Sequence, residues 1–258
     1  MDEVDKKILF YLLKDGRMPQ RQIAKSLGIS AQTLNYRMSK MIDDQIIEDF
    51  KVHVSPKIYG KVEGFAAFVS DKEVKKNFTS RLRCLEKITL YGVEGNNEEE
   101  VNRLIDEFSA ELGDPVMRYI PPADNYSGNS KDIDMVIIEQ LRKMPRAKIS
   151  EIAKAINEPV IRVKRRYNYL AKNHLLGVFA KIDLSKTDVV LFSIFSEKQE
   201  LLQPILSEIS IFQIKDEKSG VFVCFAENMV SARNIINTVR EREKDSDVMV
   251  IYDYEFLR

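Results

Sequence analysis

The sequence predicts an α+β fold made of two similar halves, each with a block of helices followed by a small helix-and-strand domain. Three observations carry this prediction: an internal repeat, apolar periods that change from helical to strand-like within each half, and an alternating charge. Lys and Arg exceed Asp and Glu by two in residues 1–60 and by seven in residues 130–186. Acidic residues are in excess by four in residues 61–129 and by five in residues 187–258. The net charge of zero therefore hides two basic blocks, and local charge makes an electrostatic footprint.

The repeat appears when the sequence is shifted against itself by 129 positions. Residues 2–50 then align with residues 131–179 without a gap, and ten positions are identical. The identities include Asp5 with Asp134 and Arg37 with Arg166, and the apolar positions agree as well. A shared apolar skeleton over this length indicates one duplicated module.

The first copy predicts three helices. Apolar residues recur with a helical period from Val4 to Leu12, and Gly16 is expected to end this helix in a left-handed conformation. Residues 20–27 form the second helix, and Gly28 is the turn. Ser30 caps a third helix that runs to about residue 44.

The second copy repeats this plan, with Asn157 in place of the turn glycine and Pro159 in the first turn of a helix over residues 160–173. Apolar–polar alternation after the third helices, in residues 46–54 and 176–184, indicates β wings. Three helices with a turn before the third, followed by a β pair, are the winged helix-turn-helix plan, which places its second motif helix in the major groove of DNA.

The third helix of each copy exposes side chains suited to DNA. Amides pair bidentately with adenine, Arg pairs with guanine, and cations bind phosphates. The first copy is the better candidate for reading bases, and the second, more cationic copy for gripping phosphates. The predicted DNA-binding residues are Ser30, Gln32, Thr33, Asn35, Tyr36, Arg37 and Lys40, and Arg162, Lys164, Arg165 and Arg166.

The acidic segments predict small α+β domains. After the second module the order is strand 189–196, helix 199–209, strands 211–215 and 220–226 around a turn at 216–219, helix 229–244 and strand 248–254. This βαββαβ order is ferredoxin-like. In the first half we expect strand 62–70, helix 72–84, one or two strands in 86–95, helix 97–112 and strand 116–120. Residues 121–130 are the best linker. The domain boundaries are 1–60 and 131–186 for the winged helix-turn-helix modules, and 61–122 and 187–258 for the ferredoxin-like domains.

These residues resemble the Lrp/AsnC family of prokaryotic regulators. The resemblance rests on Asp5, Ile8, Leu9 and Leu12, on the run from Arg21 to Ser30, on Arg37 and Ile46–Ile47, and on the following βαββαβ domain. It implies a transcriptional regulator that binds double-stranded DNA, pairs through its α+β domains and responds to a small-molecule effector. Because this chain fuses two units, it is expected to be a homodimer or an intrachain pseudo-dimer, and we assign no effector residues.

Two alternatives stay open. Siroheme decarboxylases have a similar architecture, and a tetrapyrrole site would need His residues; the chain has His53 and His174, at positions that the repeat does not relate. The other alternative is a sensor or assembly module whose helix-turn-helix units do not bind DNA. The two cysteines, Cys84 and Cys224, make neither a disulfide framework nor a zinc site. We expect no cofactor, no metal, no catalytic residues, no membrane span or signal peptide, and a cytoplasmic location.

Overall fold

The computed structural model describes residues 1–121, 131–215, 220–244 and 246–256. Most of the predicted linker and the predicted turn at 216–219 lie outside these residues. The helical elements are α1 (Glu3–Lys14), α2 (Gln20–Leu27), α3 (Ala31–Asp43), η1 (Pro56–Tyr59), α4 (Glu98–Leu112), α5 (Asp132–Lys143), α6 (Ile149–Ala155), α7 (Val160–Lys172), η2 (Leu184–Lys186), α8 (Gln199–Leu206) and α9 (Met229–Arg242). The strands are β1 (Ile47–Val54), β2 (Val62–Val69), β3 (Ser80–Cys84), β4 (Ile88–Gly95), β5 (Met117–Tyr119), β6 (Leu176–Ile182), β7 (Val190–Ser196), β8 (Ser210–Lys215), β9 (Gly220–Ala226) and β10 (Asp247–Phe256).

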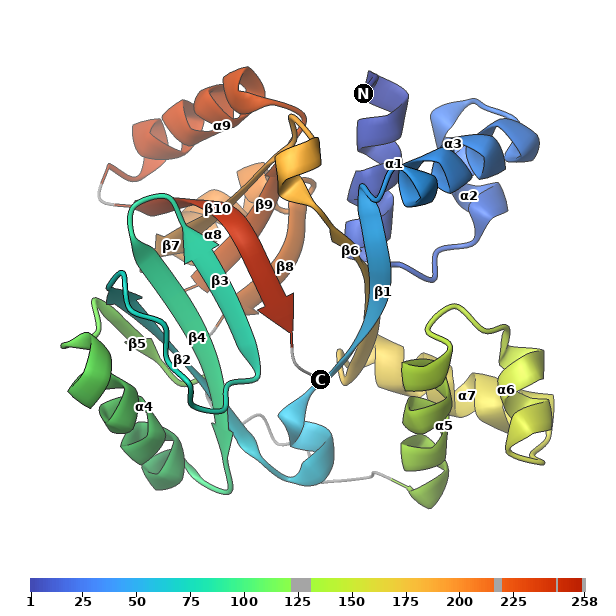
Figure 1. The fold of residues 1–258 in the computed structure, drawn as a ribbon, viewed down its shortest axis with the longest axis horizontal. Helices are drawn as coiled ribbons and strands as arrows, with labels where there is room; N and C mark the ends of the chain where they lie inside the picture. Colours follow the sequence, from blue (N-terminus) through green and yellow to red (C-terminus); the bar gives the residue numbers. More distant parts are fainter. Residues whose placement is uncertain (122–130, 216–219, 245, 257–258) are drawn as a thin grey trace.

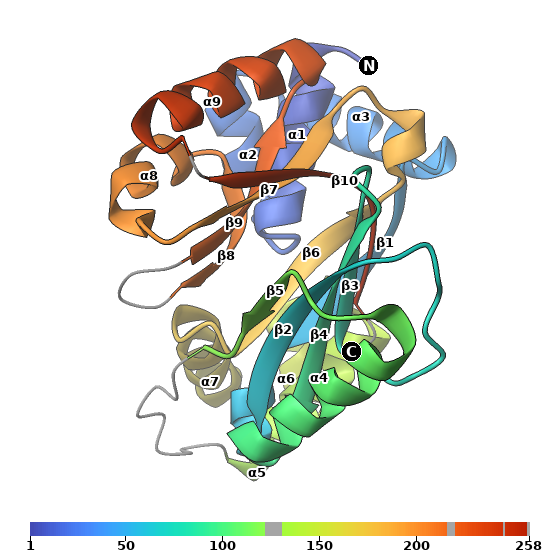
Figure 2. The ribbon, with the colours of Figure 1, turned by 90° about the vertical axis from the view of Figure 1, so that its left-hand side faces the viewer.

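One eight-stranded sheet spans both halves of the chain, in the order β5-β2-β4-β3-β10-β7-β9-β8. The halves join edge to edge where β10 pairs antiparallel with β3, so the two α+β domains associate within one chain. Helices α4, α8 and α9 cover the outer face (Figures 1 and 2), where α4 buries one apolar cluster and α8 and α9 bury another. The inner face turns toward β1, β6 and α1.

The second half has the predicted βαββαβ order, but the first half does not. The helix predicted over residues 72–84 is wrong: residues 80–84 form β3, and only irregular chain precedes them. Ser80, Leu82 and Cys84 are buried, while Arg81 and Arg83 alternate with them. Both arginines form ion pairs with β10, to Glu255 and Asp253 respectively. Pairing with β4 on one side and with the distant β10 on the other thus decided the conformation of a segment that we interpreted as a helix.

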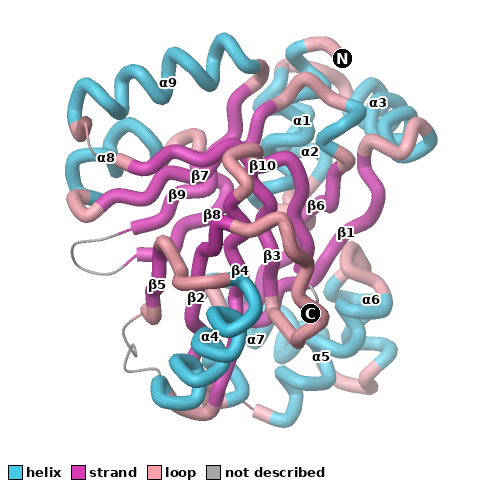
Figure 3. The backbone as a smooth tube through the Cα atoms, turned by 60° about the vertical axis from the view of Figure 1, so that its left-hand side comes forward, coloured by secondary structure: helices cyan, strands magenta, loops and turns pink. Residues whose placement is uncertain are grey.

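The predicted wings form one shared element. Strands β1 and β6 pair antiparallel with each other, with Val52 opposite Val178, and we call this two-stranded sheet the wing ribbon. Each module therefore contributes one strand rather than the β pair that we expected. The ribbon connects the modules because Val52 and Val54 of β1 pack into the core of the second module, whereas Ile182 of β6 packs into the cluster around α1. Figure 3 shows the ribbon between the sheet and the helical modules.

Three turn residues test the local predictions. Gly28 (φ 66°) and Asn157 (φ 53°) both adopt the left-handed conformation that the turn before the third helix requires. Gly16 does not, and the prediction of a left-handed helix end was wrong. A glycine is needed at position 16 because the chain there runs close to β6: a Cβ on Gly16 would lie 3.1 Å from the Cα of Phe179. The Gly16 N–H donates to the Val178 carbonyl at 2.6 Å, which docks the end of α1 on the ribbon.

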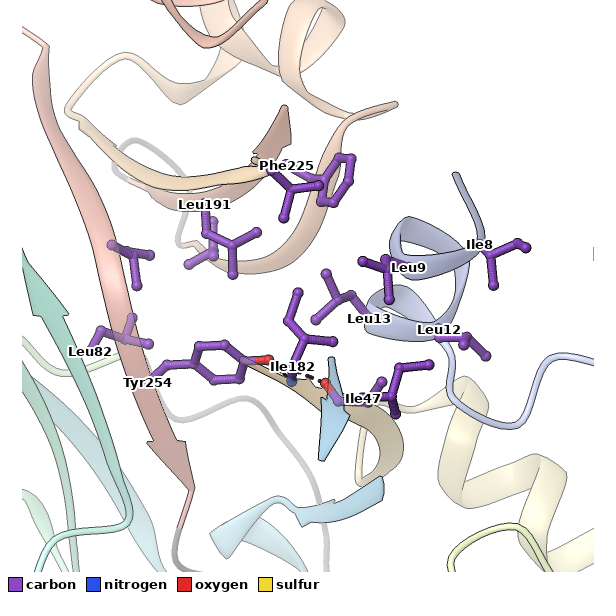
Figure 4. Close-up of a cluster of buried hydrophobic side chains, with 14 of the residues drawn as sticks. Ile8, Leu9, Leu12, Leu13, Ile47, Leu82, Ile182, Leu191, Phe225 and Tyr254 are labelled. Atoms are coloured by element: carbon purple, nitrogen blue, oxygen red, sulfur yellow. Dashed lines mark hydrogen bonds between the residues drawn. The ribbon is translucent and has the colours of Figure 1, made fainter. Parts of the chain in front are cut away.

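The largest apolar cluster lies between α1, the wing ribbon and the inner face of the sheet (Figure 4). It contains Leu9 from α1 and Leu82 and Leu191 from the two halves of the sheet. Tyr254 of β10 ties the sheet to the ribbon, because its hydroxyl accepts the Ile182 N–H at 2.9 Å and donates to the Ala180 carbonyl at 3.3 Å. The first module thus packs directly against the sheet through a shared apolar core.

Candidate nucleic-acid interface

Helix α3 presents a free polar face. Ser30 caps it, accepting the Thr33 N–H at 3.0 Å, and Leu34, Met38 and Met41 hold its opposite face in the core. The cap fixes where the helix starts, and the apolar stripe fixes its rotation. Five predicted residues within the helix are consequently exposed, Tyr36 by 70%: Gln32, Thr33, Asn35, Tyr36 and Lys40. Amide, hydroxyl, aromatic and cationic groups therefore share one helix surface.

Arg37 lies at the edge of this face and turns back onto α1. Its Nη1 donates to Asp5 at 2.8 Å and to Asp2 at 2.7 Å. These bonds raise the pKa of Arg37, and the Asp5 N–H together with Arg37 lowers the pKa of the Asp2 carboxyl. Because its charge is already paired within the module, Arg37 positions α3 against α1.

The prediction that Arg166 faces DNA was wrong. Arg166 is only 8% exposed, and its guanidinium forms two hydrogen bonds to Asp134, which is fully buried. Asp134 also accepts the Lys131 N–H at 2.8 Å, which caps α5. The pair is the equivalent of Arg37 with Asp5, so two of the ten identities in the repeat preserve an ion pair between the first and third helices.

The remaining face of α7 carries fewer free cations than the sequence suggested. Arg162 pairs with Glu158 one turn earlier, at 2.9 Å. Lys164 and Arg165 are exposed, beside Ile161, which is 82% exposed. The surfaces of α3 and α7 therefore differ in kind, one polar with amides and the other cationic with an apolar neighbour.

Two further arginines, which we did not single out, join the modules. Arg17 donates to the carbonyls of Pro145 and Ala147 at 2.6 and 2.7 Å and lies 5.0 Å from the centre of the Tyr167 ring. Arg146 lies 4.6 Å from the Phe50 ring centre, and burial lowers its pKa. The sequence signal that could have identified them is that Arg17 and Arg146 occupy equivalent positions of the repeat. Arg17 of the first module thus contacts the second module, and Arg146 of the second module contacts strand β1 of the first. These contacts hold the two modules in one orientation relative to each other.

The two histidines line one cavity between the wing ribbon and the sheet, although the repeat does not relate them. Its volume is about 250 Å³. Cys84 and Cys224 are buried, and burial raises both thiol pKa values to about 12, so neither is a reactive thiolate. In the described part of the chain, no group of three His, Cys, Asp or Glu side chains is arranged to hold a metal ion, and no helix is long and apolar enough to cross a bilayer.

Sequence comparisons place the first module in a known class. Residues 1–48 match the family described as winged helix-turn-helix DNA-binding. HTH-type transcriptional regulator LrpA of Pyrococcus horikoshii is 42% identical over 60 residues, which are 23% of this chain and 43% of LrpA. An uncharacterized HTH-type transcriptional regulator of Pyrococcus furiosus is 33% identical over 36% of this chain and 64% of its own length. The chain thus spans less than two thirds of either relative.

Similar structures include one that matches nearly the whole chain and one that matches about half of it. The siroheme decarboxylase NirDL matches over 99% of this chain and 93% of its own, at 13% identity and a TM-score of 0.49. LrpC of B. subtilis matches over 48% of this chain and 96% of its own, at 16% identity and a TM-score of 0.34. At these levels neither likeness bears on activity. By the family match, residues 1–48 are a winged helix-turn-helix module, and the proteins similar to this part of the chain include a regulator named LrpA.

Proposed function

We propose that this protein is a transcriptional regulator that binds double-stranded DNA and reads sequence through α3. The observation that carries the proposal is the free face of α3, where Gln32 and Asn35 can pair with adenine and Thr33 can bond bases or phosphates. The match of residues 1–48 to a DNA-binding module supports it. A protein with this role would act in the cytoplasm, beside the DNA.

The DNA-binding unit that we propose is one chain acting as an intrachain pseudo-dimer. The wing ribbon, the β3–β10 pairing and the two arginine contacts support this, because each joins one half of the chain to the other. In this proposal Lys164 and Arg165 of α7 bind phosphates and add affinity without sequence preference. Association of whole chains into a homodimer is not needed to bring two modules together.

The test is a binding titration with the promoter region of the protein's own gene, against a shuffled duplex of the same composition. We expect tighter binding to the promoter and a steep loss of affinity with salt. The double variant Gln32→Ala/Asn35→Ala should bind both duplexes alike. Asn237→Ala removes an exposed amide from α9, which covers the far side of the sheet, and is the matched control. Equal binding of both duplexes by the unaltered protein would contradict sequence reading.

We propose that the protein works without catalysis. The relatives named above are regulators, which supports this reading. The cavity that holds both histidines is smaller than the roughly 300–1,000 Å³ of pockets for drug-sized ligands, so His53 and His174 do not line a pocket of the size that a tetrapyrrole needs. Added haem should leave the protein's absorbance spectrum the sum of its parts; a tight, saturable spectral shift would favour the decarboxylase-like alternative.

A further inference from the structure

The cavity beneath the wing ribbon is walled by both halves of the protein. Its floor is the inner face of the sheet, with Leu82 of β3 and Leu191 of β7, and its roof is the ribbon, with His53 and Gly177. Leu82 and Leu191 point from the sheet toward the ribbon, beside Tyr254 (Figure 4). Only a small part of the surrounding side chains is polar, so the space is suited to an apolar molecule.

His53 is the polar group in the roof that lacks a partner. Its ring lies edge-on to Phe212 and Phe256, with centroids 6.4 Å from each, and within the described residues it makes no hydrogen bond. Burial lowers its pKa to about 4, so at neutral pH the ring is uncharged and offers one donor and one acceptor. His53 is half-buried, and its uncharged ring can form a hydrogen bond to a molecule in the cavity.

Gly177 makes the room. It is the direct cross-strand partner of His53, and residues opposite each other in an antiparallel pair project to the same face. A Cβ at Gly177 would meet no atom within 4 Å. The equivalent position of the first copy holds Glu48, and the equivalent of His53 is Ile182. The second copy thus has a glycine where the first has Glu48, and the first copy has a histidine where the second has Ile182. Because Gly177 and His53 are cross-strand partners, the open space lies beside the imidazole ring.

The chemistry of the walls selects the ligand. Two aromatic rings flank His53, whereas the charged Lys14 lies exposed at the rim and Glu63 accepts a hydrogen bond from Thr79. A cavity of roughly 150 Å³ lined by apolar residues holds benzene, and this one is about 250 Å³. We propose that it binds a compact, uncharged aromatic molecule of two fused rings, held by a hydrogen bond to His53. This proposal stands apart from the DNA-binding role and can hold or fail without it.

Indole is a suitable probe, because it has two fused rings and one N–H that the His53 ring can accept. The chain contains no tryptophan, so indole emission can be followed without tryptophan background when excitation is chosen beyond the absorption of its ten tyrosines. We expect saturable binding of one indole per chain. His53→Phe should weaken indole binding about 3- to 10-fold, the effect of one neutral hydrogen bond. Naphthalene, which has no such group, should bind both proteins equally.

Gly177→Leu should abolish binding of both probes, because its side chain fills the space. If that variant does not fold by circular dichroism, Gly177→Ala adds only the Cβ that meets no neighbour and should still weaken both probes. His174→Asn changes the exposed histidine at the rim, keeps a residue that tolerates its left-handed backbone, and should bind indole unchanged. The proposal would be overturned if the unaltered protein showed no saturable indole binding. It would also be overturned if the His53 and Gly177 variants bound indole as tightly as the unaltered protein does. Promoter binding measured on the same samples reports separately on the regulator role.

Discussion

The two helix-turn-helix modules share a skeleton and an ion pair but bury that pair to different depths. In the first module the Arg37 side chain keeps 27% of its surface exposed and divides its charge between Asp2 and Asp5. In the second, Arg166 closes over a fully buried Asp134. An arginine on a third helix can therefore serve the packing of its own module, even where its neighbours are exposed. The comparison teaches that identity between duplicated copies can record packing, while function lies in the positions where the copies differ.

The largest effect should come from breaking the buried pair. Arg166→Ala leaves the Asp134 charge buried without its partner and should lower the free energy of unfolding by about 3–5 kcal/mol. Arg37→Ala removes the more exposed pair and should cost about 1 kcal/mol or less. Urea denaturation followed by circular dichroism measures both.

A double variant sharpens this test. Asp134→Leu/Arg166→Met replaces both charges by apolar groups and should recover most of the stability that Arg166→Ala loses. Equal losses from Arg37→Ala and Arg166→Ala would mean that the depth of burial does not distinguish the modules.

The free energy of unfolding should depend on pH through His53 of β1, whereas β6 has no titratable group at the equivalent position. His53 titrates near pH 4 in the folded protein but near 6.5 when unfolded, whereas the second copy has Ile182 at this position. Between these values the unfolded chain binds a proton that the folded protein excludes, so stability falls as pH falls. The loss amounts to at most about 3 kcal/mol.

His53→Phe should remove this part of the pH dependence, as measured by urea midpoints between pH 7 and pH 4. His174→Asn is the control for general effects of losing a histidine. An unchanged slope in His53→Phe would show that the ring is not held neutral by the cavity.

Substitutions on α3 and on α7 should reduce DNA binding in different ways. Gln32→Ala on α3 should cost about 1–3 kcal/mol on the promoter and little on shuffled DNA, because a bidentate base contact is lost. Arg165→Ala on α7 should weaken both duplexes alike and reduce the salt slope by about one ion. Filter binding at several salt concentrations separates the two patterns; a loss of sequence preference in Arg165→Ala would assign base reading to both helices.

The smallest effect concerns the turns. Gly28→Ala puts a side chain into a left-handed backbone and should cost about 1 kcal/mol, whereas Asn157→Gly should be close to neutral. Thermal unfolding of the two variants is a sufficient measurement. A matching loss from Asn157→Gly would indicate that the asparagine side chain itself supports the second turn.

Local sequence signals predicted the helical modules well. The apolar period, the Ser30 cap and the turn residues Gly28 and Asn157 act over a few residues, and the structure confirms the cap and both turns. Segment 80–84 was misjudged because helix and strand patterns are hard to separate over a short run. One of its two partner strands, β10, also lies at the far end of the chain, whereas the other, β4, follows directly.

The candidate site was harder to predict than the fold. Helical periodicity showed which side of a helix Arg166 occupies only approximately, and it could not show that Asp134 would be buried within reach. The cavity also escaped prediction, since His53 and Gly177 become neighbours only through the pairing of β1 with β6. Contacts within a helix follow from the period, whereas contacts between distant strands depend on a register that the period does not specify.

The place of β10 between β3 and β7 sets the order of events during synthesis. A ribosome adding roughly 5–20 residues per second needs about 10–30 s to proceed from β3 to β10. Throughout that interval one edge of β3 has no neighbour, and the apolar inner face of the first half lies open. The nascent first half is thus an unfinished template whose stability depends on the last strand, and a stalled ribosome would leave an aggregation-prone edge.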